Sequence, residues 1–198
     1  MDFYNLSSAK SSRSSLLSLN KVDRSHSKLE VQDCTVYSRV GFRGVGAEAF
    51  LESNGLPIPK LPNQSLSYKN GLIILRLSKS EFWVVDTANK HHALIEALEL
   101  SSKEAINVYR LYCQHSHGCF LITGDADLTV KMFSKVCSVD LSQGVFALGS
   151  IAQTSVARTN AIVTKQSMDG VVFTLLLADV ASTQYLWEAI EDAASEFV

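Results

Sequence analysis

Apolar and polar residues follow one another along the chain in short blocks whose periods predict strands and helices. Blocks rich in β-branched and aromatic residues predict strands. These blocks are residues 34–42, 72–77, 81–86, 106–113 and 119–124, followed by strands near 150–164 and 170–178. Blocks with apolar residues three and four positions apart predict amphipathic helices. These are residues 47–54, 88–100, 125–137 and 182–197.

Short polar turns between neighbouring strands predict two hairpins. One turns at residues 78–80, and the other turns around residues 116–118, between the strands at 106–113 and 119–124. The cadence of strand, helix, hairpin and helix is typical of split βαβ units. A weak internal echo supports it, because "VGAEAFLES" and "ITGDADLTVKMF" each place a glycine and an acidic residue between a strand and a helix. We therefore predict an α+β fold of two ferredoxin-like halves, with antiparallel sheets backed by helices.

The first 28 residues differ from the rest of the chain. They are rich in serine and basic residues and have few apolar side chains to bury, so we expect a flexible tail over residues 1–28. No apolar core of a secretory signal is present. The serine and arginine content also fits a mitochondrial presequence, but Asp2 and Asp23 argue against one. Residues 29–198 are expected to form a single globular domain, with halves at about 29–104 and 105–198.

Composition excludes several classes of partner. The 198 residues are 46% hydrophobic and 19% charged, with a formal net charge of -2. This balance favours neither nucleic acid nor an anionic membrane. The longest apolar runs fall far short of the ~20 residues that span a bilayer, so we expect a soluble, cytoplasmic protein. Its cysteines form no CxxC motif, which favours free thiols in a reducing compartment. They are Cys34, Cys113, Cys119 and Cys137.

Glycines at the predicted corner between strand and helix raise the question of a phosphate-binding loop. Gly41, Gly44 and Gly46 are spaced G-x-x-G-x-G. The dinucleotide fingerprint is G-x-G-x-x-G, and the P-loop needs a Lys-Ser or Lys-Thr pair that is absent here. We therefore expect these glycines to serve backbone geometry.

The segment "CQHSHGC" contains four possible zinc ligands. Cys113, His115, His117 and Cys119 alternate in sequence, and residues two apart on a strand lie about 6.6 Å from one another. Four such side chains cannot converge on one tetrahedral ion, and zinc pairs usually follow other spacings. We expect a hairpin with half-buried cysteines instead.

Other titratable residues suggest no catalytic group. His91 and His92 open a helix without an identifiable nucleophile, and no G-x-S-x-G motif is present. The pair Glu191–Asp192 fits a solvated helix face. Arg76, and the arginine in "ARTNA" at residues 157–161, lie in or beside apolar strands, where arginines usually pair with a carboxylate or coat an interface. The sequence therefore predicts no catalytic, cofactor-binding or metal-binding residue.

A proline-rich segment is the best candidate for a contact surface. Residues 56–64 hold all three prolines of the chain, so we expect an extended and rigid segment. Leu56, Ile58 and Leu61 cannot all be buried by such a segment on its own fold. We expect it, together with Arg43, to contact a partner chain.

The motifs together resemble the γ subunit of heterotetrameric sarcosine oxidase. The similar stretches are "RVGFRGVGAEAFLESNGLPIPKLPNQ", "GLIILRLSKSEFWVVD", "VCSVDLSQGVFALGSIAQTSVA" and "YLWEAIEDAASEF". The resemblance covers about residues 35–198. The positions that carry it are Arg39, Gly41, Gly44, Gly55, Leu56, Pro62, Asn63, Arg76, Leu77, Glu81, Phe82, Cys137, Asp140, Phe146, Gly149, Thr154, Trp187 and Phe197.

This resemblance implies both a fold and a role. The implied fold is that of the folate-binding glycine-cleavage T-protein, or aminomethyltransferase. The implied complex oxidatively demethylates sarcosine to glycine and transfers the one-carbon unit to tetrahydrofolate. FAD, FMN, NAD and tetrahydrofolate would lie on other subunits, so this chain would hold no cofactor and would partner α, β and δ subunits.

Two alternatives remain open at this stage. One is a stand-alone folate-binding aminomethyltransferase-like protein, and the other is a binding or regulatory module that has kept the fold. Neither the amine oxidised nor the stoichiometry of an assembly follows from the sequence.

Overall fold

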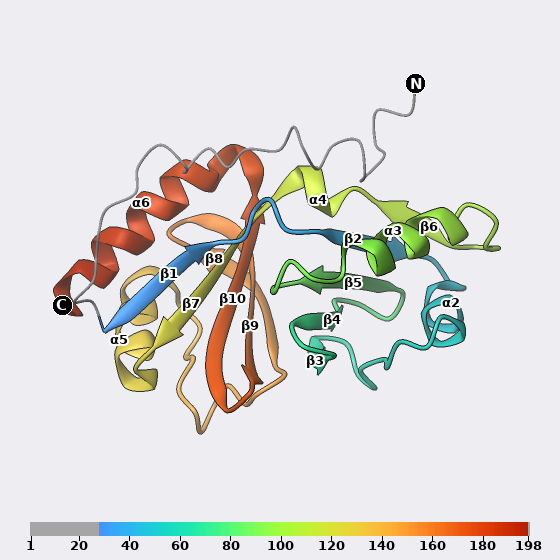
Figure 1. Ribbon diagram of the computed structural model, residues 1–198. Helices are drawn as coiled ribbons and strands as arrows, with labels where there is room; N and C mark the ends of the chain where they lie inside the picture. Colours follow the sequence, from blue (N-terminus) through green and yellow to red (C-terminus); the bar gives the residue numbers. More distant parts are fainter. Residues whose placement is uncertain (1–27, 198) are drawn as a thin grey trace. The chain divides into compact units, whose positions relative to one another are not determined.

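The computed structural model describes residues 28–197 (Figure 1). Within this range the chain forms two compact units, one of residues 36–115 and the other of residues 28–35 with 116–197. The tail predicted over residues 1–28 lies outside the described residues, except for Lys28. The predicted single domain over 29–198 and the boundary of its halves stay predictions.

The first unit is a five-stranded antiparallel sheet with two helices. Its elements are β2 (Arg39–Arg43), α2 (Ala47–Ser53), β3 (Gln64–Tyr68), β4 (Leu72–Arg76), β5 (Glu81–Asp86), α3 (His92–Ser101) and β6 (Tyr109–Leu111). The strand order is β3-β4-β5-β2-β6. Without the edge strand β3, the order β4-β5-β2-β6 is that of a split βαβ unit.

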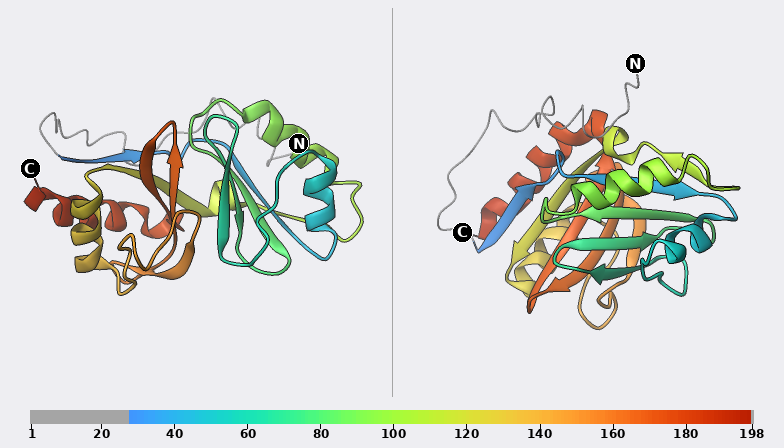
Figure 2. Two further views of the ribbon diagram at one scale, coloured as in Figure 1. Left: turned by 90° about the horizontal axis from the view of Figure 1, so that it is seen from below. Right: turned by 45° about the vertical axis from the view of Figure 1, so that its right-hand side comes forward.

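Alternate positions along the strands build the core of this unit. Val40 and Phe42 on β2 point to the same face as Leu72 and Ile74 on β4, because side chains two apart share a face. Both helices cover this face (Figure 2). Their buried contributions are Ala47 and Leu51 from α2, and Ile95 and Leu98 from α3.

The second unit repeats this plan with one strand taken from earlier in the chain. Its elements are β1 (Leu29–Asp33), β7 (His117–Gly124), α5 (Ala126–Val136), β8 (Ile151–Val156), β9 (Thr159–Met168), β10 (Val171–Asp179) and α6 (Thr183–Ala194), with short 3₁₀ turns at Val180–Ser182 and Ser195–Phe197. The strand order is β1-β7-β10-β9-β8, antiparallel throughout. Here β1 takes the place that β6 has in the first unit.

Helices α5 and α6 pack on one face of the second sheet. Met132 and Phe133 of α5 and Leu186 and Ile190 of α6 are at most 1% exposed and belong to one apolar cluster with strand residues such as Phe120. Gly118 lets α6 start close to the sheet, because a Cβ there would lie 2.6 Å from Thr183 Oγ1. Among the described residues, no helix is long and apolar enough to cross a lipid bilayer.

The predicted α+β class with two antiparallel, helix-backed sheets is confirmed. The hairpin at residues 78–80 is also confirmed, because β4 pairs with β5. The second predicted hairpin is wrong. Residues 109–111 pair with β2, whereas residues 117–124 pair with β1 and β10, and the short helix α4 (Cys113–Ser116) separates them.

Three strands were missed or misplaced by the pattern. β1 and β3 are edge strands with only two apolar or aromatic residues among their five positions, Leu29 and Val31 in β1 and Leu66 and Tyr68 in β3, so their apolar content is too low to reveal them. The expected strand near 150–164 is two strands, β8 and β9, joined by a tight turn. Ala157 and Arg158 form this turn with φ values of 47° and 66°, a conformation for which glycine or asparagine is the usual signal.

Candidate functional site

The corner between β2 and α2 is shaped by close backbone approach. Gly44 has φ 134°, and a Cβ at this residue would lie 2.0 Å from the carbonyl oxygen of Asn107. The Gly44 N–H donates to Ser80 O at 2.9 Å, and the Gly46 N–H donates to Asn107 O at 3.2 Å. Because these N–H groups are used within the fold, they cannot cradle a phosphate. The predicted backbone role of these two glycines is confirmed.

The four residues of "CQHSHGC" do not form a ligand cluster. Cys113 and His115 belong to the first unit, and His117 and Cys119 belong to the second. Both cysteines are buried, at 1% exposure each. Among residues 28–197, no group of three or more His, Cys, Asp and Glu side chains is arranged to hold a metal ion. That this chain binds no zinc stays a prediction.

The start of α3, at His91 and His92, is held by the carboxylate of Asp86. Buried Asp86 accepts hydrogen bonds from the backbone N–H groups of Ala88 and His91, at 3.0 and 2.6 Å. The His91 ring reaches the carbonyl oxygen of Asn70 at 3.2 Å. These contacts give His91 a structural role at the start of α3.

A serine–histidine pair, which the sequence did not reveal, joins the residue before β2 to the first residue of α3. Ser38 Oγ lies 2.7 Å from His92 Nδ1, within the range for a nucleophile and its base. However, Ser38 is only 3% exposed, so a substrate carbonyl cannot reach its oxygen. The two residues are 54 positions apart, and no short motif could have announced the contact.

Arg76 ties the proline segment to the first unit. Its guanidinium forms two hydrogen bonds with the Glu48 carboxylate, at 2.8 and 2.9 Å. It also donates to the carbonyl oxygens of Pro59 and Lys60, at 2.9 and 3.4 Å. The expectation that Arg76 pairs with a carboxylate is confirmed. The arginine of "ARTNA", Arg158, is instead exposed in the β8–β9 turn.

Arg39 is the largest fully buried polar side chain of the first unit, at 1% exposure. Its guanidinium donates to the carbonyl oxygens of Cys113, Tyr37 and Gln114, at 3.2, 3.3 and 3.4 Å. Backbone carbonyls thus stabilise the buried charge, which holds the start of β2 against α4. These contacts give Arg39 a structural role.

A third buried cation, Lys165, contacts the loop between α5 and β8. Lys165 Nζ donates to the Leu141 carbonyl oxygen at 2.5 Å, and the Lys165 carbonyl accepts from the Gly149 N–H at 2.8 Å. Burial lowers the pKa of Lys165, and the charge of Asp140 opposes this shift. Hydrogen bonds from Ser142 lower the pKa of Asp140. The side chain and the backbone carbonyl of Lys165 therefore contact this loop at two points, Leu141 and Gly149.

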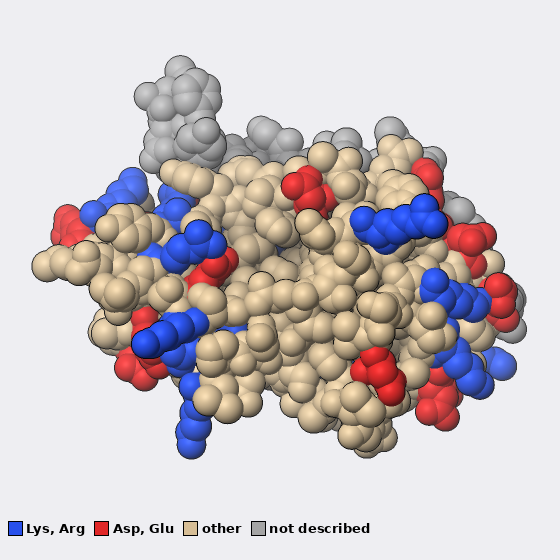
Figure 3. Space-filling model, turned by 180° about the vertical axis from the view of Figure 1, so that it is seen from behind, with Lys and Arg blue, Asp and Glu red and all other residues tan. Residues whose placement is uncertain are grey.

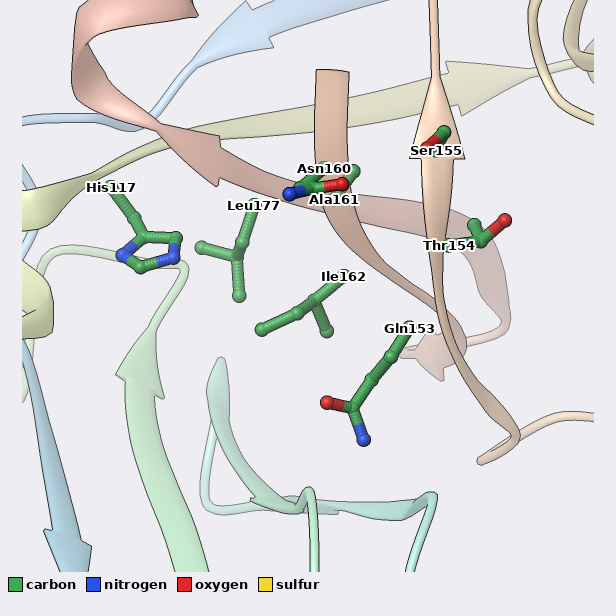
Figure 4. A pocket seen from close by; sticks show the side chains of 8 residues that line it. All are labelled: His117, Gln153, Thr154, Ser155, Asn160, Ala161, Ile162 and Leu177. Atoms are coloured by element: carbon green, nitrogen blue, oxygen red, sulfur yellow. The ribbon is translucent and has the colours of Figure 1, made fainter. Parts of the chain in front are cut away.

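An open polar hollow lies on the face of the second sheet opposite the helices. His117, Gln153, Ile162 and Leu177 project into it (Figure 4). Gln153 is opposite Ile162 on β9, which in turn is opposite Leu177 on β10, so these three form one row across the sheet. No carboxylate, lysine or arginine is among the eight residues that line it. Its polar groups are the imidazole of His117, the hydroxyls of Thr154 and Ser155, and the amides of Gln153 and Asn160.

Glu191 and Asp192 lie on α6, where Asp192 is exposed and Glu191 partly so. Their placement fits the solvated helix face expected from the sequence. A second serine–histidine pair is exposed, since Ser116 Oγ lies 2.8 Å from His117 Nδ1.

Solved structures show what this architecture is similar to. A chain of the heterotetrameric sarcosine oxidase from Corynebacterium sp. U-96, in complex with pyrrole 2-carboxylate, superposes with a TM-score of 0.69 and 20% sequence identity. The match covers 85% of each chain. The two chains share one fold. No protein-family model matches the sequence, and no curated protein matches it at a significant level.

A second solved structure extends the similarity to the T-protein fold. Glycine cleavage system aminomethyltransferase T from Bartonella henselae matches with a TM-score of 0.58 and 17% identity. The match covers 82% of this chain but only 45% of the aminomethyltransferase. The T-protein-like fold expected from the resemblance is therefore confirmed, over a chain that spans less than half of that enzyme.

Proposed function

We propose that this chain is a structural, non-catalytic subunit of the γ type in a sarcosine-oxidase-type complex. The observation that carries the proposal is the shared fold over 85% of both chains. The partners would be the α, β and δ subunits.

The chemistry of the described residues supports a non-catalytic role. Arg39, Arg76 and Lys165 are used to hold backbone carbonyls, and the Ser38–His92 pair is shielded from substrate. In this proposal the oxidative demethylation of sarcosine to glycine takes place on other subunits. FAD, FMN, NAD and the tetrahydrofolate that accepts the one-carbon unit would be bound there as well.

Exposed apolar side chains support assembly with other chains. Val45, Ile106 and Tyr109 are 85%, 84% and 64% exposed, and they surround the β2–α2 corner. Rigid apolar and aromatic groups of this kind are enriched in the centres of permanent interfaces. On the face shown in Figure 3, basic and acidic side chains are interspersed. That distribution favours a protein partner over a polyanion.

A stand-alone aminomethyltransferase-like protein is the second candidate. The shared fold favours it, but the chain covers only 45% of the aminomethyltransferase. A lone chain would therefore lack the rest of that enzyme. A binding or regulatory module with this fold differs from the first proposal only in its partner.

Co-expression with the α, β and δ subunits of a sarcosine oxidase from the same organism tests the proposal. We expect a single complex by size-exclusion chromatography. The complex should show a flavin spectrum, whereas the chain alone should show none and should hold no stoichiometric zinc. If the chain elutes by itself while the other subunits assemble without it, the proposal is wrong. Calorimetric binding of tetrahydrofolate to the isolated chain would favour the second candidate.

A further inference from the structure

Two asparagines in this chain directly precede a glycine, at Asn54–Gly55 and Asn70–Gly71. In such pairs the glycine nitrogen can attack the asparagine side-chain carbonyl, because glycine has no Cβ to hinder the approach. The reaction needs a glycine N–H that can lose its proton and a side-chain amide that is free to turn. The two pairs differ in both respects.

Asn70–Gly71 lies in the turn between β3 and β4, and the Asn70 side chain is exposed. No hydrogen bond of the Asn70 side chain or of the Gly71 N–H is made to any residue in the range 28–197. His91 Nε2 lies 3.2 Å from the Asn70 carbonyl oxygen. Because that oxygen can only accept, the imidazole donates to it.

The contact with His91 activates the nucleophile. The Asn70 carbonyl and the Gly71 N–H belong to the same peptide group, whose electrons are delocalised. A hydrogen bond donated to the oxygen withdraws electron density from the nitrogen and makes the Gly71 N–H more acidic. His91 thus favours the deprotonated nitrogen that attacks.

In Asn54–Gly55, at the end of α2, both reacting groups form hydrogen bonds. Asn54 Nδ2 donates to Phe50 O at 2.8 Å, and the Gly55 N–H donates to Glu52 O at 2.9 Å. Both the side-chain amide and the attacking nitrogen are therefore engaged in hydrogen bonds. This pair is a matched control within the same chain.

We propose that Asn70 is a site of spontaneous deamidation, promoted by His91. The Gly71 nitrogen loses its proton and forms a bond to Asn70 Cγ, while the bond from Cγ to Nδ2 breaks and ammonia leaves. Water then opens the resulting succinimide at either carbonyl and gives aspartate or isoaspartate. No oxidant or reductant is involved.

The isoaspartate product would disturb the β3–β4 turn. It inserts one methylene group into the main chain directly before Gly71. The Gly71 carbonyl accepts hydrogen bonds from Thr87 N–H and Thr87 Oγ1, each at 2.8 Å, and a Cβ at Gly71 would lie 2.4 Å from Ala88 Cβ. This packing leaves no room for a longer backbone. The modification would therefore weaken the contact between the turn and residues 87–88.

The test follows both asparagines in the purified full-length chain. Samples are incubated at mildly alkaline pH, digested, and mapped by mass spectrometry with chromatographic separation of aspartate and isoaspartate peptides. We expect Asn70 to convert several-fold faster than Asn54. Equal rates, faster conversion of Asn54, or no conversion at either position would overturn the proposal.

Substitutions at His91 test its part in the reaction. His91→Phe should slow conversion at Asn70 several-fold without affecting Asn54, and circular dichroism checks that the variant is folded. His91→Gln keeps a hydrogen-bond donor, so its rate of conversion at Asn70 should lie between those of the wild-type chain and His91→Phe. If His91→Phe converts Asn70 at the wild-type rate, the histidine has no such role. These outcomes do not depend on whether the chain assembles with other subunits.

Discussion

At the scale of single residues, hydrogen bonds to backbone carbonyls explain how three cationic side chains are buried. Arg39, Arg76 and Lys165 each hold backbone carbonyls. A buried cation needs such acceptors, because its transfer from water is costly without them. A backbone carbonyl also explains Gly44, because the Asn107 carbonyl oxygen occupies the space that a Cβ at residue 44 would need.

Gly44→Ala should therefore destabilise the chain. The new Cβ would meet the Asn107 carbonyl oxygen at 2.0 Å, and φ 134° is a strained conformation for alanine. We expect a loss of about 1–3 kcal/mol in the free energy of unfolding, measured by urea denaturation. Gly144→Ala is the matched control, because nothing lies within 4 Å of its Cβ position. Equal stability of both variants would show that the backbone at Gly44 and Asn107 can move apart at no cost in free energy.

At the scale of elements, the two units are built on one plan with different chain order. In the first unit the fourth strand of the split βαβ pattern is β6, which follows α3. In the second unit the same position is filled by β1, which precedes the whole first unit in sequence. The whole first unit therefore lies in sequence between β1 and β7, the two strands that pair at this edge of the second sheet.

Leu29→Ala tests whether β1 is an integral part of the second unit. Leu29 is 2% exposed and belongs to the cluster formed with α5 and α6. Removing its side-chain atoms should leave a cavity and cost about 2–5 kcal/mol in urea denaturation. Glu30→Ala, at the neighbouring exposed position, should change stability little. A Leu29→Ala variant as stable as the Glu30→Ala variant would mean that β1 is dispensable.

At the scale of the whole molecule, the proline segment and the corner patch of Val45, Ile106 and Tyr109 are the surfaces to examine for assembly. The expectation that residues 56–64 cannot bury all their apolar side chains holds for Leu61, which is 60% exposed. Leu56 is buried at 3% exposure, and Ile58 packs partly against the core. Arg43 is paired with Glu81. Leu61 is thus the residue that best tests a partner contact.

Leu61→Asp should leave the isolated chain folded, because its side chain is mostly exposed. In the proposed complex, the charge should prevent or strongly weaken co-elution with the larger subunits, since a buried unpaired carboxylate is costly. Val171→Asp, at a 55% exposed position of the second unit, is the matched control. Normal assembly of Leu61→Asp would show that this segment is not part of the interface.

The sequence alone determined the class of fold and the type of the longer elements, but not the edge strands β1 and β3 or the short helix α4. Apolar periods and local turn residues are encoded within a few positions, so the longer helices and the hairpin of β4 and β5 could be predicted. The spacing of Gly41, Gly44 and Gly46 is also a local feature. It did not match a phosphate-binding motif, and the backbone role predicted instead for Gly44 and Gly46 is confirmed by the structure.

Only the tertiary structure decided which strands pair and which polar residues meet. β6 and β7 look like a hairpin in sequence but belong to different sheets, because strand pairing depends on contacts between distant residues. The partners Ser38 and His92, Arg39 and Gln114, and Arg76 and Glu48 are 28 to 75 positions apart. No local pattern specifies such pairs, because they form only when packing of the apolar faces brings their strands and helices together.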